Sequence, residues 1–408
     1  MEHFPTGLAV AAARSRAPWL LPRLRKELPL LAGLVFGLAV MALFGFFASR
    51  ERGVGVNDFS YFWAGGHTVL DGADPYDGVS FAAESGQFGT APPHESVFAY
   101  PPWVALALVP LAALPLWVAS GLFTYGGMLL AALGLRAVLR VFASGLPAVH
   151  TLAGAALFAS QPGLAALQAG QWAFLLTGAL AWMVVALRER SPLRHLASLA
   201  LLLKPQLVLF DVWALVRAAL ARRGSRYAAI VVGLFATAVA IPWLLFPDWL
   251  AAYGRAFVAQ RLDYVPPTTP AQALLDLVGA PGAWLGAGAL LVAVAAGLLF
   301  DPRSDAWFAV WIAVSASFPV YAWSYDQVVL VVPVAIAAGV VARRRARAGL
   351  VVGVAGYAFL LLGPALLYEI ANRRESESFS AFVPLAVLAL VVAALWPERR
   401  RPLLESTE

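Results

Sequence analysis

The sequence contains no cysteine and little charge. Because none of its 408 residues is cysteine, disulfides, thiol catalysis and thiolate metal sites are excluded. Charged residues make up 13% of the chain, whereas they form about a quarter of a soluble domain. Histidine is scarce too, with 5 residues and no spacing typical of a metal site. We therefore expect neither a metal nor a cofactor.

Apolar residues dominate what is present. They make up 61% of the chain, and long apolar runs recur from residue 28 to residue 396. A composition of this kind is typical of a polytopic membrane protein. The net charge of +6 comes from short basic clusters between the apolar runs, as in cytoplasmic loops, and does not indicate nucleic-acid binding.

The apolar runs predict an all-α bundle of about 10–12 transmembrane helices, since a span needs about 20 apolar residues. The stretch 191–220 is long enough for one crossing, but Lys204-Pro205 interrupts it, and we expect two short spans that meet at a polar turn. The clear candidates are 28–49, 116–140, 150–168, 171–187, 226–246, 282–300, 305–321, 325–341, 348–370 and 381–396.

Basic clusters between alternate runs predict the orientation of the chain, because cytoplasmic loops are enriched in Lys and Arg. These clusters lie within 14–26, 136–140, 188–190, 217–226, 343–347 and 399–401. We expect a cytoplasmic basic segment over 1–27, one membrane domain over 28–396 and a cytoplasmic tail over 397–408. Loops 50–115 and 247–281 then lie on the outer, periplasmic face of a bacterial inner membrane and cover a site there.

The first outer loop is acidic and aromatic. Its stretch NDFSYFWAGGHTVLDGADPYD, residues 57–77, predicts a short helix whose aromatic stripe lies in the membrane interface. The stretch FAYPPWVALALVPLAALP, residues 98–115, is short for a span and suits a re-entrant or interfacial segment. Asp58 lies just beyond the first span, and we consider two roles for it: a helix N-cap or a site residue.

Five stretches resemble the successive motifs of one family, the polyprenyl-phosphate-mannose-dependent mannosyltransferases of glycosyltransferase family 87, in the GT-C superfamily. They are the two quoted above, followed by QAGQWAFLLTGALAW, LLLKPQ and YAWSYDQVVLVVP. Two positions depart from the pattern. Trp172 and Ala173 follow Gly-Gln where many members carry Asn, and Asp326 is the nearest polar residue where many carry His.

The resemblance implies a GT-C-like fold and an enzyme that moves a sugar, mannose by expectation, from a polyprenyl-phosphate donor to a glycolipid or glycan acceptor on the outer face, with inversion. It implies Asp58 as the general base. A lipid phosphate leaves without a proton donor, so one carboxylate suffices, provided that cationic groups hold the phosphate. Lys204, Arg255 and Arg261 are the expected phosphate-binding residues.

The remaining expected site residues are polar or aromatic residues on the outer side. They are Tyr61, Tyr76, Tyr100, Gln171, Tyr264, Trp323 and Asp326. For Trp323 alone, interfacial anchoring is favoured over stacking on a sugar ring, because Trp is common at membrane interfaces.

Two further functions compete with the transferase. A transporter or flippase for a lipid-linked sugar would need polar residues at the midplane and access from both sides, whereas the carboxylates here gather at one face. A structural protein of the cell envelope would leave Asp58, Lys204 and Asp326 without a shared purpose. We expect these three residues and Gln171 to face one outer cavity.

Overall fold

The computed structural model describes residues 20–48, 57–87, 98–262, 267–374 and 376–399, and every regular element within them is a helix. This confirms the all-α class. The helices are α2 (Leu20–Ala48), α3 (Asp58–Leu70), α4 (Gly78–Gln87), α5 (Pro102–Ala112), α6 (Leu116–Phe142), α7 (Pro147–Ala159), α8 (Gln161–Ala169), α9 (Ala173–Arg188), η2 (Pro192–Leu203), α10 (Pro205–Arg223), α11 (Ser225–Leu245), α12 (Trp249–Leu262), α13 (Pro270–Val278), α14 (Pro281–Leu298), α15 (Ala306–Ser317), η3 (Ser324–Leu330), α16 (Val331–Ala342), α17 (Ala346–Arg374), η4 (Ser378–Ala381), α18 (Phe382–Leu395) and η5 (Trp396–Glu398).

Six helical segments in the described part of the chain are long and apolar enough to cross a membrane. They are α6, α11, α14, η3 with α16, α17, and η4 with α18 and η5. A seventh candidate is the pair formed by α7–α8 and α9, which bends by 119°. The polytopic membrane class is therefore confirmed.

These six or seven segments are fewer than the about 10–12 spans that the apolar runs predict. The difference arises because some runs form shorter helices. The run 305–321 contains α15, which has 12 residues. The run 191–220 breaks at the expected position, since η2 ends at Leu203 and α10 begins at Pro205, but neither half is among these candidate segments.

Ion pairs of arginine gather at one end of the bundle, which we call the basic end. Asp305, just before α15, pairs with Arg188 at 2.5 Å, Arg343 at 2.8 Å and Arg222 at 3.5 Å. Burial would raise the pKa of Asp305, but the three arginines hold it below its ordinary value. Glu27 likewise pairs with two arginines of α6.

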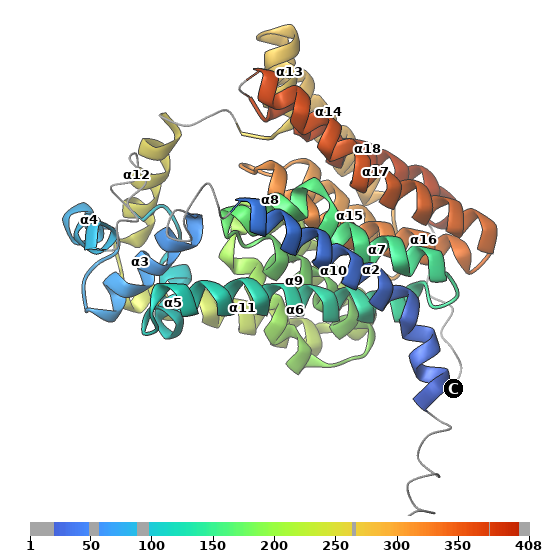
Figure 1. Ribbon diagram of the computed structural model, residues 1–408, viewed down its shortest axis with the longest axis horizontal. Helices are drawn as coiled ribbons and strands as arrows, with labels where there is room; N and C mark the ends of the chain where they lie inside the picture. The colour runs from blue at the N-terminus through green and yellow to red at the C-terminus, as the bar shows by residue number, and fades with distance from the viewer. Residues whose placement is uncertain (1–19, 49–56, 88–97, 263–266, 375, 400–408) are drawn as a thin grey trace, which may run out of the picture.

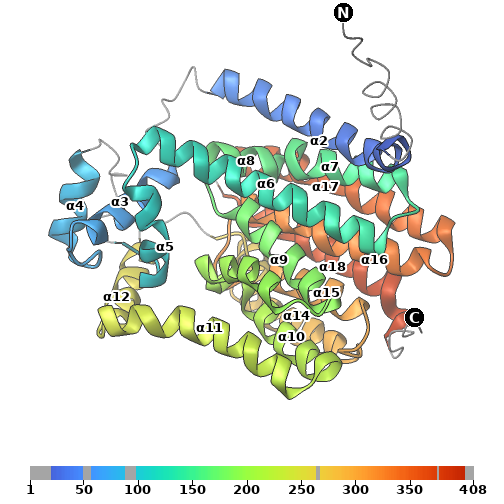
Figure 2. The same cartoon turned by 90° about the horizontal axis from the view of Figure 1, so that it is seen from below.

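The opposite end, which we call the α3 end, carries the short helices of the two long loops. Figures 1 and 2 show α3, α4, α5 and α12 gathered there, with the turn between α16 and α17 at the far end of the molecule. Lys204 directly precedes α10, which runs on to Arg222 at the basic end, and Asp326 lies in η3, which continues through α16 to Arg343 at the same end. They therefore lie toward the α3 end.

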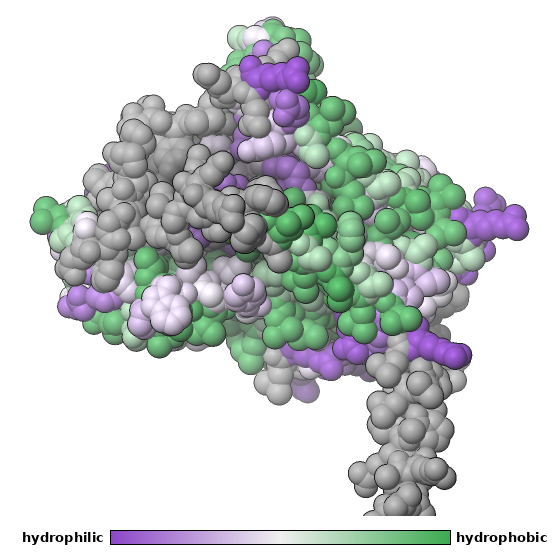
Figure 3. All heavy atoms as spheres, in the orientation of Figure 1, coloured by the Kyte–Doolittle hydropathy of each residue, from purple (hydrophilic) through white to green (hydrophobic). Residues whose placement is uncertain are grey.

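The long helices expose large apolar side chains between the two ends. Examples are Leu129 on α6, Leu291 on α14 and Leu362 on α17. Figure 3 shows apolar atoms covering the helices of one face, with hydrophilic atoms concentrated toward the edges. A surface of this kind is suited to lipid and not to water.

Helix α3 is buried within the protein. Phe59, Tyr61, Phe62 and Trp63 are each at most 3% exposed. Phe59 packs on Phe123 of α6 with ring centroids 4.7 Å apart. The expected membrane-facing aromatic stripe is thus wrong for this helix: its aromatics face α5, α6 and α9, and fix Asp58 at the start of α3.

The turn between α8 and α9 requires glycine. Gly170 has φ +63°, and a Cβ there would lie 2.8 Å from the Asn57 side-chain nitrogen. We expect Gly170→Ala to lower the free energy of unfolding by more than the about 1–2 kcal/mol that left-handed backbone costs a non-glycine residue. Gly72→Ala is the control for thermal unfolding, since Gly72 has φ +77° and open space around it. Equal losses would show that the approach to Asn57 does not matter.

Candidate active site

Asp58 is joined to Gln171 across the α3 end. The Gln171 side-chain amide donates a hydrogen bond to a carboxylate oxygen of Asp58. Asp58 is the first residue of α3, whereas Asn57 holds the N-cap position and makes no side-chain cap bond. The structure therefore does not support the N-cap role considered for Asp58.

The Asp58 residue is accessible to solvent, although protein atoms surround its carboxyl. Its residue is exposed to solvent, yet burial raises the pKa of its carboxyl above the ordinary aspartate value. The hydrogen bond from Gln171 and the positive charge of Lys204 act in the opposite direction. Solvent therefore reaches this residue although protein surrounds its carboxyl, so a substrate hydroxyl can approach it.

Gln171 tunes the protonation of this carboxyl. Its amide stabilises the ionised form, so replacing it by leucine should raise the Asp58 pKa further. If the ionised carboxyl is the active form, activity falls as pH drops through this pKa. We therefore expect Gln171→Leu to move the acid limb of the kcat/KM profile to higher pH. We also expect it to lower the plateau roughly tenfold to a hundredfold, because bonds to charged groups contribute about 1.5–3 kcal/mol. A lower plateau with an unmoved acid limb would contradict this link.

Lys204 and Asp326 form a buried ion pair. The lysine Nζ lies 2.7 and 2.6 Å from the two carboxylate oxygens, and both side chains are 2% exposed. Asp326 also accepts a hydrogen bond of 3.0 Å from the Trp323 backbone N–H. The sequence predicted both residues for the site but not their pairing with each other.

This pairing changes the electrostatics expected for a phosphate. With all three groups ionised, Asp58, Lys204 and Asp326 carry a net charge of −1. Lys204 cannot act as a free cation while Asp326 neutralises it. A phosphate bound here needs either further positive charge or a rearrangement of the pair.

Three of the expected tyrosines tie the first loop together. The Tyr61 hydroxyl accepts a hydrogen bond of 2.5 Å from the Ala99 backbone N–H. The Tyr76 hydroxyl donates to the Tyr100 carbonyl at 2.6 Å. The Tyr100 ring lies 6.3 Å from that of Trp172, next to Gln171. Tyr61 is 3% exposed and positions the loop, whereas Tyr76 and Tyr100 are partly exposed.

The remaining expected residues are spread more widely. Trp323 is half-buried, with its ring 5.9 Å from that of Tyr321. Arg255 is exposed on α12. The side chain of Arg261 and all of Tyr264 lie outside the described residues.

Two aromatic residues outside the expected set pack close to the site. The Tyr325 ring lies 5.0 Å from the Lys204 nitrogen, and Trp172 packs on Phe62 with centroids 4.6 Å apart. The signal for Tyr325 was present, because it directly precedes Asp326 in YAWSYDQVVLVVP. Only the fold shows which partners each ring has.

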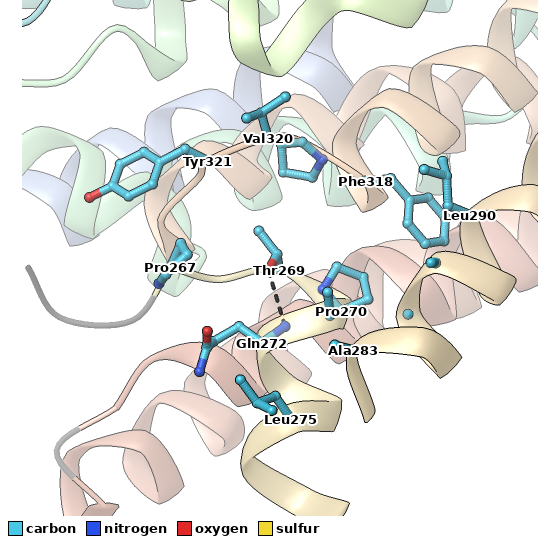
Figure 4. Close-up of a pocket in the computed structure, with 14 residues that line it drawn as sticks. Pro267, Thr269, Pro270, Gln272, Leu275, Ala283, Leu290, Phe318, Val320 and Tyr321 are labelled. Carbon is cyan, nitrogen blue, oxygen red and sulfur yellow. Dashed lines mark hydrogen bonds between the residues drawn. The ribbon is translucent and has the colours of Figure 1, made fainter. Parts of the chain in front are cut away.

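Two cavities lie in the described part of the chain, and neither is lined by Asp58, Gln171, Lys204 or Asp326. The first, which we call the Thr269 cavity, has about 560 Å³ and is lined mainly by apolar residues of α13, α14 and the segment 318–321 (Figure 4). The Val320 N–H donates to the Gln206 carbonyl, which places this cavity beside the Lys204-Pro205 break. The second, the Trp249 cavity, has about 520 Å³ and lies between the α3–α4 turn, α5 and the α11–α12 turn.

Among the described residues, one group of side chains could hold a metal ion. His67, Asp71 and Glu84 bring three ligand atoms within 4.8 Å of one another, and His67 Nδ1 lies 2.9 Å from a Glu84 oxygen. A protonated His67 paired with the two carboxylates gives the same arrangement. Sequence spacing could not show this group, because Glu84 comes from α4 and the other two from the end of α3.

Comparison with known proteins finds a family similarity in the central region of the chain. Residues 98–280 match the model of glycosyltransferase family 87. No curated protein and no solved structure matches the chain. The matched region, a little under half of the chain, begins with the FAYPP stretch and contains Gln171 and Lys204. Together with the apolar helices, the family 87 match indicates a membrane glycosyltransferase and does not favour a transporter.

Proposed function

We propose that this chain transfers a sugar, mannose by family resemblance, from a polyprenyl-phosphate donor to a hydroxyl of a glycolipid or glycan acceptor. The observation that carries the proposal is the reachable, crowded Asp58 carboxyl bonded to Gln171, within a membrane protein that carries a glycosyltransferase family 87 match. The reaction takes place at the α3 end, which we assign to the outer face because the arginines gather at the other end.

In the proposed reaction, the bond between the sugar C1 and the phosphate oxygen breaks and its electron pair leaves with the phosphate. The acceptor oxygen attacks C1 from the opposite side, so the configuration inverts. Its proton passes to the Asp58 carboxylate as the new C–O bond forms. No acid is needed for the leaving group, because a phosphate monoester is stable as an anion.

The growing phosphate charge needs cations. Lys204 supplies one positive charge if donor binding moves its ammonium group partly away from Asp326. Arg255 and Arg261 on α12 supply further positive charge from the second loop. Tyr100, Trp323 and Tyr264 complete the proposed sugar and acceptor contacts. Recruiting the α12 arginines would offset the net negative charge of Asp58, Lys204 and Asp326.

We assign the lipid chain of the donor to the Thr269 cavity. Pro270, Leu290 and Phe318 give it apolar walls, and it lies next to the Lys204-Pro205 break. We expect Ala287→Phe, which projects into this cavity from α14, to raise the KM for a long-chain donor roughly tenfold, since displacing two methylene groups costs about 0.8 kcal/mol each. Leu291→Phe is the control, because Leu291 is 71% exposed on the same helix.

The proposal is tested by incubating the purified protein with radiolabelled polyprenyl-phosphate mannose and a panel of glycolipids. We expect the label to move to an acceptor without any nucleotide. Transfer from a nucleotide sugar, with none from any lipid-phosphate sugar, would overturn the donor assignment. Equal KM values for the long-chain donor in Ala287→Phe and Leu291→Phe would show that the Thr269 cavity is not part of the donor site.

A further inference from the structure

The Trp249 cavity has a lining unlike that of the Thr269 cavity. Asp74, Tyr76, Asp248 and Trp249 line it, together with Leu106 of α5 and apolar residues of the α11–α12 turn. None of its lining residues is Lys or Arg. Two exposed carboxylates without a cation among the lining residues disfavour a phosphate or any other anion. A lipid phosphate therefore does not suit this cavity.

The same lining suits a neutral ligand with many hydroxyl groups. Carboxylates accept hydrogen bonds from hydroxyls, and aromatic rings provide apolar faces against which sugar rings pack. In the described part of the chain, the Asp248 carboxylate makes no hydrogen bond. Trp249 is 6% exposed, and its indole N–H has no hydrogen-bond partner there either. A buried donor of this kind is normally satisfied, by water or by a ligand.

The Trp249 cavity is connected to Asp58 but lies at a distance from it. Tyr76 lines the cavity, and its hydroxyl donates a hydrogen bond to the Tyr100 carbonyl. The Tyr100 ring lies 6.3 Å from that of Trp172, the neighbour of Gln171. Asp58 begins α3, whereas the cavity lies at the other end of this 13-residue helix, about 20 Å away. One sugar residue cannot span that distance.

The surroundings of the cavity also indicate a membrane-bound ligand. Leu244 and Leu245, at the end of α11, are 84% and 59% exposed, and Leu245 lines the cavity. Apolar side chains beside exposed carboxylates are typical of the membrane interface. A glycolipid headgroup would therefore meet the cavity from the lipid side.

We propose that the Trp249 cavity binds the non-reacting sugars of the acceptor, so that the preferred acceptor is a glycolipid with an oligosaccharide headgroup. The inference rests on the proposed transfer reaction. Binding energy from these distant sugars would position the reacting hydroxyl at Asp58.

The test compares acceptors with one sugar and with several sugars. We expect Asp248→Asn to raise the KM of the long acceptor about tenfold, while the rate with the one-sugar acceptor stays unchanged. Asp77→Asn is the control, because Asp77 is exposed in the same loop as Asp74 but does not line the cavity. An equal effect of Asp248→Asn on both acceptors, or on neither, would overturn the proposal.

A binding measurement separates this inference from the transfer reaction. Neutral manno-oligosaccharides are titrated into the full-length wild-type protein and the Asp248→Asn variant while tryptophan fluorescence is recorded. We expect saturable binding that the variant weakens about tenfold, and none for inorganic phosphate. Transfer without such binding would overturn the cavity assignment alone, whereas binding without any transfer would overturn the proposed reaction and with it the acceptor role.

Discussion

Asp58→Asn is expected to lower the transfer rate by about two to four orders of magnitude, the usual contribution of a general base. Asparagine keeps the size of the side chain and can still bond to Gln171, but it cannot take a proton from the acceptor. Because the change preserves packing at the start of α3, thermal unfolding should stay close to that of the wild type. The measurement is the single-turnover transfer rate of purified protein with saturating donor.

The control is Asp71→Asn, which removes a carboxylate just beyond the other end of α3. The Asp71 side chain is 53% exposed and lies 3.5 Å from His67 Nδ1. Because an exposed pair of this kind contributes at most about 1 kcal/mol, the change should leave both the rate and the stability nearly unchanged. Near-normal transfer by Asp58→Asn would remove Asp58 from the mechanism. A large loss in both variants would point instead to the general charge of the loop.

Lys204→Met should have the largest effect on stability. It leaves the Asp326 carboxylate buried and without its lysine, and breaking a buried pair from one side costs about 3–5 kcal/mol. Replacing both residues by apolar ones of similar volume, as in Lys204→Met with Asp326→Leu, should recover most of this loss. Thermal unfolding in detergent measures both effects.

The same double variant separates structure from catalysis. If Lys204 binds the donor phosphate, the double variant stays folded but remains strongly impaired in transfer, with a raised KM for the donor. A folded double variant with normal kinetics would show that the pair only stabilises the fold. The two outcomes therefore distinguish a role of Lys204 in donor binding from a purely structural role of the Lys204–Asp326 pair.

Predictions from the sequence agree with the structure where the residues of a single segment determine the feature. The break at Lys204-Pro205 follows from proline chemistry and appears between η2 and α10. The short helix over 102–112 follows from its flanking prolines and limited length. Asp58 stood out because it lies a few residues beyond an apolar run, among the aromatics of a motif stretch. Its hydrogen bond to Gln171 joins two of the motif stretches.

Features that depend on packing between distant segments could not be predicted. Lys204 and Asp326 are 122 residues apart, and nothing in either stretch shows that their charges neutralise each other. An aromatic stripe on α3 has the same sequence pattern whether it faces lipid or protein. Only the packing of α5, α6 and α9 against it shows that it faces protein. The Trp249 cavity brings together the α3–α4 turn and the α11–α12 turn, which no local pattern relates.

The central claim is that the Asp58 carboxylate takes the proton of the acceptor hydroxyl. An experimental structure with a non-transferable polyprenyl-phosphate sugar and an acceptor glycolipid tests it most directly. We predict that the reacting hydroxyl oxygen lies about 2.6–3.2 Å from an Asp58 carboxylate oxygen, on the side of the sugar opposite the phosphate. Both substrates bound with that hydroxyl facing another base, while Asp58 contacts only Gln171, would contradict the account.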